Sequence, residues 1–215
     1  MLSRVADNLY WMSRYLERAE HTARLLDVNL DEMLDQTPAA SDRRWELLLY
    51  SLQLNPDELL PAGSGTKSPE LLVDALTVNA NNSFSIVSLV NMARENARQV
   101  REQISTEMWI QLNQLYQRLK KTSVEDIWEE SPHTFLQHWI KDEIQKFQGI
   151  TDATMSHGEG WHFIQIGRCI ERALATTTLL DVHFQANESM VTQEAYERDL
   201  EWVALLKSCT SFEAY

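Results

Sequence analysis

The sequence predicts an all-α protein, an elongated bundle of several helices. Apolar residues recur at steps of three and four along most of the 215 residues, which is the period of an amphipathic helix. Only six Gly and five Pro occur, a content that favours long helices over many turns, and no alternating apolar–polar run typical of a strand stands out. A chain of this length can bury a sizeable core, so we expect residues 1–215 to form a single helical domain.

One stretch of the sequence occurs twice. Nine of the fifteen positions from Arg14 to Val28 recur unchanged, without a gap, from Arg168 to Val182, which is 154 residues later. Both copies contain the pattern Arg-x-x-Glu-Arg-Ala and end on Leu-Leu-Asp-Val. An internal repeat governs the architecture of a chain and is sought before any fold is assigned. We therefore expect an internally duplicated long helix, at about residues 3–34 and 159–185.

The apolar residues of each copy form a stripe along the predicted helix. Steps of three and four separate them in the first copy, at Leu9, Met12, Leu16, Ala19, Ala23, Leu26 and Leu30, and in the second, at Phe163, Ile166, Ile170, Ala173, Thr177, Leu180 and Phe184. Each stripe predicts a seam packed against other helices. On the opposite side fall the ionisable residues Arg14, Glu17, Arg18 and His21, together with Tyr10 and Leu25. We therefore expect both helices to be covered on two sides, with Arg–Glu pairs at the second contact.

Prolines, glycines and caps divide the rest of the chain. Pro38 stops the first helix, Ser41 or Asp42 caps the second, and residues 55–68 form a flexible surface loop rich in Pro and Gly. Further helices are expected to follow serine caps at Ser68, Ser83, Ser105 and Ser131. These boundaries complete an all-helical assignment of the chain.

Three interpretations of the Arg–Glu pairs are open. Surface ion pairs at spacings of three and four contribute about 0.2–0.5 kcal/mol each. A partly buried network would fix the register of the helices. Arginine also offers a planar two-pronged donor suited to an anion or carboxylate site. With a weak echo of the motif at Glu95 and the junction described next, the candidate polar site comprises Arg14, Glu17, Arg18, Glu95, Asp152, Glu159, Arg168, Glu171 and Arg172.

The segment at residues 149–162 is the most unusual junction. Three glycines and several ionisable residues precede the second repeat helix, whose free N–H groups favour anions. Asp152 and Glu159 can instead cap helix N-termini, while Gly149 ends the helix that begins at Pro132. Glu159 and His162 have the Glu-x-x-His spacing of di-iron bundles, but the other such pair in the chain is interrupted by a proline. We therefore assign no metal and no cofactor.

Composition limits the classes of partner. The formal net charge of −13 repels nucleic acid and anionic membranes, so we expect neither as a partner. Cys169 and Cys209 form no disulfide or zinc pattern, and no phosphate-cradling Gly-rich loop followed by Lys occurs. No signal peptide and no stretch of eighteen apolar residues is found, which predicts a cytoplasmic protein.

Several segments together resemble a known family, the alpha-E domain family of bacterial helical proteins of undetermined biochemical role. These segments are residues 2–12, 14–19, 93–98, 103–109, 149–161, 167–173 and 212–215. The resemblance implies a gene neighbourhood with, or fusion to, a circularly permuted ATP-grasp protein, often with transglutaminase-like or proteasome-like peptidases. Family members usually continue past the Phe-Glu-Ala-Tyr segment. We therefore expect a truncated C-terminus that leaves apolar surface uncovered, and a homodimer or an open groove.

Three functions are open, and the sequence leaves it undecided whether the chain is an enzyme. The first is a helical accessory or scaffold component of an ATP-grasp-linked peptide or amide synthesis or modification system, with an ATP-grasp ligase as protein partner. The second is a stand-alone enzyme that acts on peptides or carboxylates through its Arg/Glu pairs. The third is a structural oligomer. Convergence of both repeats on one polar cleft would favour the enzyme, whereas packed Arg–Glu pairs on separate faces would favour the other two.

Overall fold

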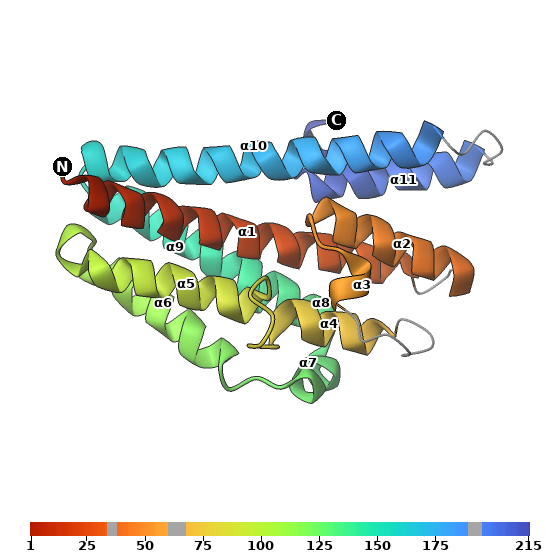
Figure 1. Cartoon of the computed structure of the whole chain (residues 1–215), viewed down its shortest axis with the longest axis horizontal. Helices are drawn as coiled ribbons and strands as arrows, with labels where there is room; N and C mark the ends of the chain where they lie inside the picture. The colour runs from red at the N-terminus through yellow and green to blue at the C-terminus, as the bar shows by residue number, and fades with distance from the viewer. Residues whose placement is uncertain (34–37, 60–67, 189–194) are drawn as a thin grey trace.

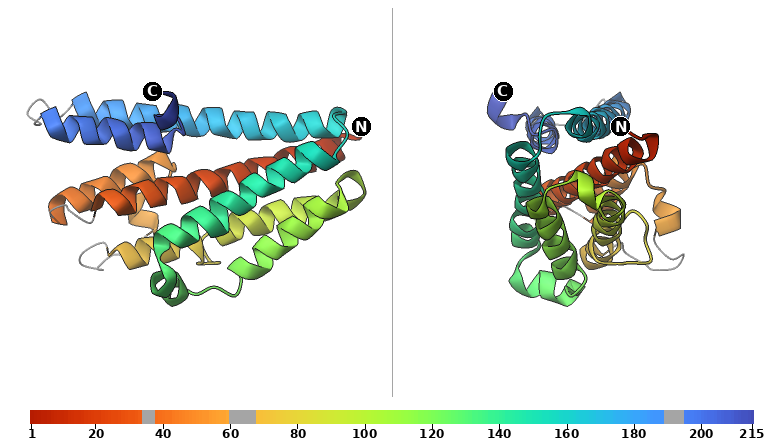
Figure 2. Two further views of the ribbon diagram at one scale, coloured as in Figure 1. Left: turned by 180° about the vertical axis from the view of Figure 1, so that it is seen from behind. Right: turned by 90° about the vertical axis from the view of Figure 1, so that its left-hand side faces the viewer.

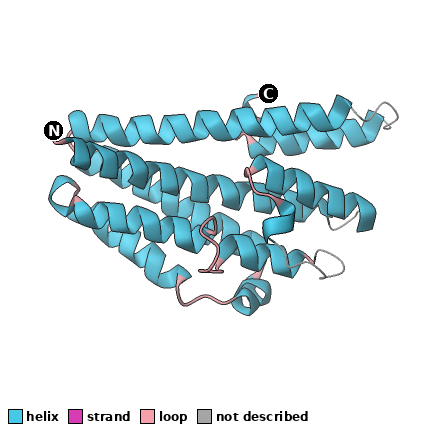
Figure 3. Cartoon of the chain, viewed as in Figure 1, coloured by secondary structure: helices cyan, strands magenta, loops and turns pink. Residues whose placement is uncertain are grey.

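A computed structural model of the chain describes residues 1–33, 38–59, 68–188 and 195–215. Every regular element in these ranges is helical, as predicted (Figure 3). The elements are α1 (Ser3–Met33), α2 (Pro38–Ser51), α3 (Pro56–Leu59), α4 (Pro69–Thr77), α5 (Ile86–Gln99), η1 (Arg101–Gln103), α6 (Thr106–Leu119), α7 (Val124–Glu130), α8 (Pro132–Thr134), η2 (Phe135–Lys141), α9 (Asp142–Thr154), α10 (Glu159–Glu188), α11 (Ala195–Ser208) and η3 (Phe212–Ala214). No helix in these ranges is long and apolar enough to cross a membrane.

Helix α1 runs through the middle of an elongated bundle (Figures 1 and 2). It packs against α10 on one side and α5 on another, and it also contacts η2, α11, α2, α4, α8 and α9. The predicted seam of α1 is buried from Leu9 to Leu26, and so is Leu25 on the other side of the helix. Burying an apolar side chain of this size contributes about 1.5–3 kcal/mol. The expectation that the first repeat helix is covered on two sides is confirmed.

Helix α10 lies on the outside of the bundle, and the prediction of a second buried seam is wrong (Figure 1). Ile166 and Ile170 are each 45% exposed and Phe184 is 51% exposed. The buried face of α10 is the opposite one, which carries Ile164 and Leu179. The physical reason is position: α1, α2 and α11 pack against the inner side of α10, and no counterpart of α5 covers its outer side among the described residues.

The serine caps of α4 and α6 form as predicted. Ser68 Oγ accepts a hydrogen bond from the Leu71 N–H, and Ser105 Oγ accepts one from the Met108 N–H. Helix α5 is capped by Ser85, two residues later than expected. These caps satisfy N–H groups that have no partner within the first helical turn.

Two proline-rich boundaries differ from the predictions. Pro38 is the first residue of α2 and not the stop of the first helix, which fits a residue whose missing N–H is not needed in a first turn. In the predicted loop at residues 55–68, Pro56 begins the short helix α3. The remainder of that loop, residues 60–67, lies outside the described residues.

The helical stretch that begins at Pro132 does not end at Gly149. It runs through α8, the π-helical segment η2 and α9 as far as Thr154, with Gly149 inside α9. A glycine costs about 1 kcal/mol in a helix interior. Burial of Ile144 and Phe147 on the same helix outweighs this cost.

Candidate functional site

The two repeat helices lie side by side, parallel and in register. Both begin at the same end of the bundle, where the N-terminal amine of Met1 lies 2.7 Å from Glu159 Oε2 (Figure 1). They approach closely at Ser13 and Gly167, which are equivalent positions of the repeat. A Cβ atom at Gly167 would collide with Ser13 Oγ and with the carbonyl oxygen of Tyr10. This contact fixes the register that sets each Glu-Arg pair opposite the other.

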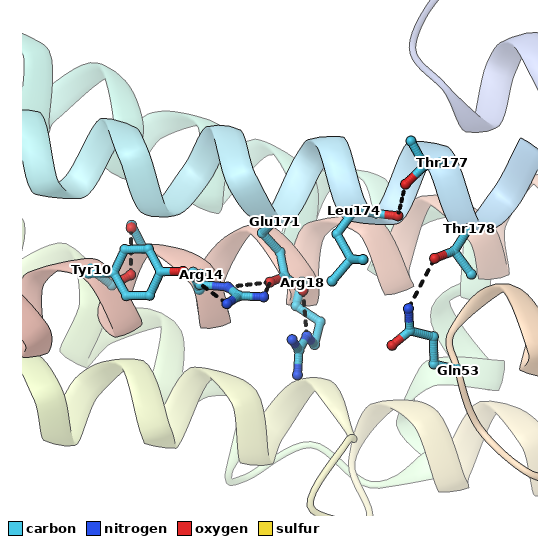
Figure 4. A network of polar contacts seen from close by, with 9 residues as sticks. Tyr10, Arg14, Arg18, Gln53, Glu171, Leu174, Thr177 and Thr178 are labelled. Carbon is cyan, nitrogen blue, oxygen red and sulfur yellow. Dashed lines mark hydrogen bonds and ion pairs between the residues drawn. The ribbon is translucent and has the colours of Figure 1, made fainter.

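Glu171 of α10 binds two arginines of α1 (Figure 4). Arg14 Nε donates to Glu171 Oε2 at 2.6 Å, and Arg18 Nε donates to Glu171 Oε1 at 2.6 Å. Arg14 also donates to the Tyr10 hydroxyl at 3.0 Å and lies 4.9 Å from the centre of the Trp11 ring. Burial lowers the pKa of Arg14, but the hydrogen bond and charge of Glu171, with a contribution from Tyr10, raise it by more. The pKa of Arg14 is therefore raised, and the guanidinium remains a cation.

Glu17 of α1 makes the reciprocal contact with α10. Arg172 Nε donates to Glu17 Oε1 at 2.6 Å, and this hydrogen bond raises the pKa of Arg172. Gln148 of α9 donates to Glu17 Oε2 at 3.4 Å and accepts from Arg168 Nη1 at 3.5 Å. Each glutamate thus binds the arginine of the opposite Glu-Arg pair. The arginine three residues before each glutamate also contributes to these contacts. Arg14 binds Glu171 directly, whereas Arg168 reaches Glu17 through Gln148.

We call this set the Glu–Arg network; its members are Arg14, Glu17, Arg18, Arg168, Glu171 and Arg172. Its two carboxylates are 1% and 4% exposed, which excludes the interpretation as surface ion pairs. All carboxylate oxygens accept a hydrogen bond from a side chain. Removing one partner of a buried ion pair costs about 3–5 kcal/mol because a buried charge is left unpaired. The geometry is that of a structural joint between α1 and α10.

Glu95, the candidate on α5, does not join the Glu–Arg network. Its two oxygens pair with Arg94 at 2.7 Å and Arg98 at 2.8 Å, both on its own helix. The Glu95 side chain is 43% exposed, so these are surface pairs of small energetic weight. The echo of the motif in α5 therefore does not build the same contact.

The junction residues also lie apart from the Glu–Arg network. Asp152 is in the last turn of α9 and not at a helix N-terminus as expected; its Oδ1 accepts from Trp161 Nε1 at 2.9 Å and Gln165 Nε2 at 3.1 Å. Glu159 binds the N-terminal amine, whose hydrogen bond and charge lower the pKa of that carboxyl. Glu159 and His162 gather no third His, Cys, Asp or Glu in the described part of the chain.

A pocket of about 680 Å³ opens at this end of the bundle. The first residues of α1, the segment before α6 and the start of α10 line it, and Glu159 is among them. No member of the Glu–Arg network lines it. The two halves of the predicted polar site are therefore separate in space.

A buried charged cluster lies one turn further along α1; the sequence analysis placed His21 on this side of the helix but missed Glu20 and Arg24. Arg24 Nη1 donates to Glu20 Oε1 at 2.9 Å, and both side chains are nearly inaccessible. Glu20 Oε2, His21 Nε2 and Arg24 Nε are buried without a hydrogen-bond partner among the described residues. Burial raises the pKa of Glu20 against the lowering effect of Arg24, and burial together with Arg24 lowers the pKa of His21 to about 3. The sequence contains one signal for this cluster: the two copies of the repeat differ here, because the second copy has Leu, Ala and Thr at these three positions.

The space beside this cluster is small. A cavity of about 10 Å³ lies where α1, α10 and α11 meet, lined by His21, Arg24, Arg172 and Cys209 among others. It has room for at most one water molecule. Burial raises the pKa of the Cys209 thiol, the opposite of what activates a nucleophilic cysteine. Shifted pKa values of this kind are typical of reactive sites, but the cavity beside the cluster has no space for a substrate.

Comparison with known proteins identifies the family. The whole chain, residues 1–215, matches the model of the Alpha-E family, described as a predicted alpha-helical domain with a conserved ER motif. Similar proteins include uncharacterized proteins of Mycobacterium bovis and of two strains of Mycobacterium tuberculosis, each 29% identical over 232 aligned positions. The alignments cover 99% of this chain and 25% of each relative, so the chain spans about a quarter of their length. No solved structure matches the chain.

The description of the family agrees with the joint between the repeat helices. Glu17-Arg18 in α1 and Glu171-Arg172 in α10 are both ER dipeptides, and each binds the other. With a family model that matches its full length, the chain belongs to the Alpha-E family.

Proposed function

We propose that this chain is a helical accessory or scaffold component of an ATP-grasp-linked system that synthesises or modifies peptides or amides. The observation that carries the scaffold role is the closure of the Glu–Arg network. A substrate-binding or catalytic role requires charged groups that face a cleft. Glu17 and Glu171 are buried and already paired with arginines across the α1–α10 contact.

The ATP-grasp partner follows from the family resemblance and not from the geometry. The geometry contributes a rigid parallel pair of long helices, with α1 surrounded by other helices and α10 exposed along its outer side. A bundle of this kind is suited to hold a partner protein in a fixed orientation. The net charge of −13 favours a partner with a basic contact surface.

Affinity capture of the tagged chain from its own host, followed by mass spectrometry, tests this function. We expect an ATP-grasp protein in near-equal amount, and a direct complex when the two purified proteins are mixed. A tagged helical protein of similar negative charge serves as the control for non-specific retention. Recovery of the chain without an ATP-grasp protein, or failure of the purified pair to associate, would contradict the proposal.

The pocket at the start of α10 supports the second candidate, an enzyme that acts on peptides or carboxylates. Its size is within the range of small-molecule sites, about 300–1,000 Å³. Its lining includes Glu102 and Glu159 but no arginine, which is unfavourable for a carboxylate. Calorimetric titration with short peptides would favour this candidate if binding occurs and disappears in Gly158→Trp, a change that adds a large side chain to the pocket lining at a position where a Cβ meets nothing within 4 Å.

A further inference from the structure

We infer that the cavity where α1, α10 and α11 meet is a binding site for one buried water molecule, which bridges the charged cluster of α1 to the end of α11. We call this molecule the bridging water. Its site lies within the chain itself and is independent of the ATP-grasp partner. The polar residues that line the site include His21 and Arg24 of α1, Arg172 and Thr176 of α10, and Ser208 and Cys209 at the end of α11.

Two buried nitrogen atoms of α1 require a partner. His21 and Arg24 are 6% and 5% exposed, and both side chains line the cavity. His21 Nε2 and Arg24 Nε have no hydrogen-bond partner among the described residues. A buried polar group without a partner loses the hydrogen bonds that it makes with water in the unfolded chain, and such groups in folded proteins are therefore paired. The described part of the chain does not supply that partner here.

The size and the chemistry of the cavity select water as the partner. The cavity has a volume of about 10 Å³, and one water molecule needs about 10–15 Å³ of such space. Arg24 Nε can only donate a hydrogen bond, so its partner must accept one. Burial together with the charge of Arg24 lowers the pKa of His21 to about 3, so the imidazole is neutral at neutral pH. A water molecule accepts from Arg24 and donates to, or accepts from, His21 according to the tautomer of the ring.

The charges around the cavity favour a neutral molecule over an ion. Arg172 Nε donates to Glu17 Oε1 at 2.6 Å, and both residues line the cavity. Arg24 Nη1 donates to Glu20 Oε1 at 2.9 Å. Each arginine at the site therefore has its own carboxylate, and no unbalanced charge remains to offset the desolvation of a buried chloride or sodium ion.

The bridging water holds the end of α11 against the two repeat helices. Ser208, the last residue of α11, is 4% exposed and brings a hydroxyl group to the cavity. A buried water molecule makes about three hydrogen bonds, so a hydroxyl group of this kind can complete the bridge from His21 and Arg24. Within residues 201–208 of α11, only Ala204 and Leu205 are buried apolar residues. With so little apolar burial in this part of the helix, a polar bridge contributes substantially to its attachment.

A high-resolution crystal structure of the chain tests the site directly. We expect one density peak within about 2.7–3.2 Å of both Arg24 Nε and His21 Nε2. A crystal grown in sodium bromide identifies the occupant, because bound bromide gives an anomalous signal and water does not. A cavity without density, or an anomalous peak at this position, would overturn the inference.

Hydrogen exchange measured by NMR tests the bridge in solution. The variants His21→Leu and His21→Gln are similar in size, but only the amide of glutamine can bond to the bridging water. We expect His21→Leu to speed the exchange of α11 amides by about tenfold and His21→Gln by less than about twofold. The N–H of Cys209, which donates to the Leu205 carbonyl at 3.0 Å, reports on the end of this helix.

Two controls accompany the exchange experiment. His162→Leu removes an exposed imidazole of α10 and should leave the exchange of α11 unchanged. Amides of α6, which packs against α5 and α9, show whether each variant keeps its fold. Equal acceleration of α11 by His21→Leu and His21→Gln, or no acceleration by His21→Leu, would contradict a water bridge to α11.

Discussion

Helices α1 and α10 share nine of fifteen residues in their repeated stretch, yet α1 is buried on two faces and α10 mainly on one. The face with the Glu-Arg pair is buried in both, because each helix supplies one half of the Glu–Arg network. The apolar stripe is buried in α1, whereas in α10 Ile166, Ile170 and Phe184 are exposed and Leu180 is only partly buried. The shared residues thus encode the contact between the two helices, and the surroundings determine whether the other face is covered.

The positions at which the copies differ are equally instructive. Where α1 carries the buried Glu20, His21 and Arg24, α10 carries Leu, Ala and Thr. A helix at the centre of a bundle buries these groups, and burial shifts their pKa values.

The largest contrast between the two helices should appear at equivalent stripe positions. Leu16→Ala should lower the free energy of unfolding by about 2–5 kcal/mol, because Leu16 is 3% exposed and its removal leaves a cavity. Ile170→Ala, at the matching position of α10, should cost less than about 1 kcal/mol, because Ile170 is 45% exposed. Urea denaturation measures both. Equal costs would mean that α10 is buried to the same extent as α1.

Loss of either carboxylate of the Glu–Arg network should destabilise the fold more than loss of Glu95, the glutamate in the weak echo of the motif on α5. Glu171→Gln should lower the free energy of unfolding by about 3–5 kcal/mol, because Arg14 and Arg18 lose their shared partner. Glu17→Gln should cost slightly less, since Arg172 is half exposed and can be solvated. Glu95→Gln, the surface control, should change stability by less than about 0.5 kcal/mol. Melting temperatures unchanged by both Glu17→Gln and Glu171→Gln would exclude a structural role for the network.

The close approach of α1 and α10 can be tested by adding one methyl group at Gly167. Gly167→Ala should lower the free energy of unfolding by about 1–3 kcal/mol, because the new methyl group meets Ser13 and the Tyr10 backbone. Gly149→Ala is the control, since a Cβ there meets nothing within 4 Å. It should stabilise α9 by about 0.5–1 kcal/mol through helix propensity. A neutral Gly167→Ala measured by thermal denaturation would show that the helices lie further apart.

The buried cluster of α1 should add a dependence on pH. The pKa of His21 is about 3 in the folded chain, below its ordinary value of 6.5, so only the unfolded chain binds this proton between these values. Stability should fall as pH decreases from about 6.5 toward 3, by at most about 1.4 kcal/mol per pH unit, and His21→Gln should flatten this slope. The raised pKa of Glu20 acts in the opposite direction, because the folded chain binds that proton more tightly. Glu20→Gln should therefore steepen the acid loss.

Urea denaturation at a series of pH values measures these slopes. His162→Gln is the matched control, because His162 is exposed on α10. Its slope should match that of the wild type. A His21→Gln variant with an unaltered slope would show that His21 can be protonated in the folded chain.

Helix class and much of the core of α1 could be predicted from the sequence. Apolar spacing identifies which residues share a face, and for Leu9 to Leu26 that face is buried. The same spacing from Ile166 to Phe184 was assigned to a buried seam, and the structure exposes it. Periodicity reports that residues share a face, but whether another helix covers that face depends on contacts between distant parts of the chain.

The candidate site was predicted in its components but not in its arrangement. The Arg–Glu pairs were expected at a second helix contact, and the in-register parallel pairing brings six of the nine candidates together. Glu95, Asp152 and Glu159 are ionisable like these six residues, but they lie in other parts of the structure. Gln148 carries no sequence signal, because its bridging role arises only when α9 packs beside both repeat helices.

A double-mutant cycle between Glu171 and Arg18 tests the central claim most directly. The single variants Glu171→Gln and Arg18→Gln and the double variant would be compared by urea denaturation. The reciprocal Glu–Arg contact predicts a coupling energy of about 1–3 kcal/mol between these residues of α10 and α1. A coupling energy near zero would contradict the account, because the ER dipeptides would then not join the two helices.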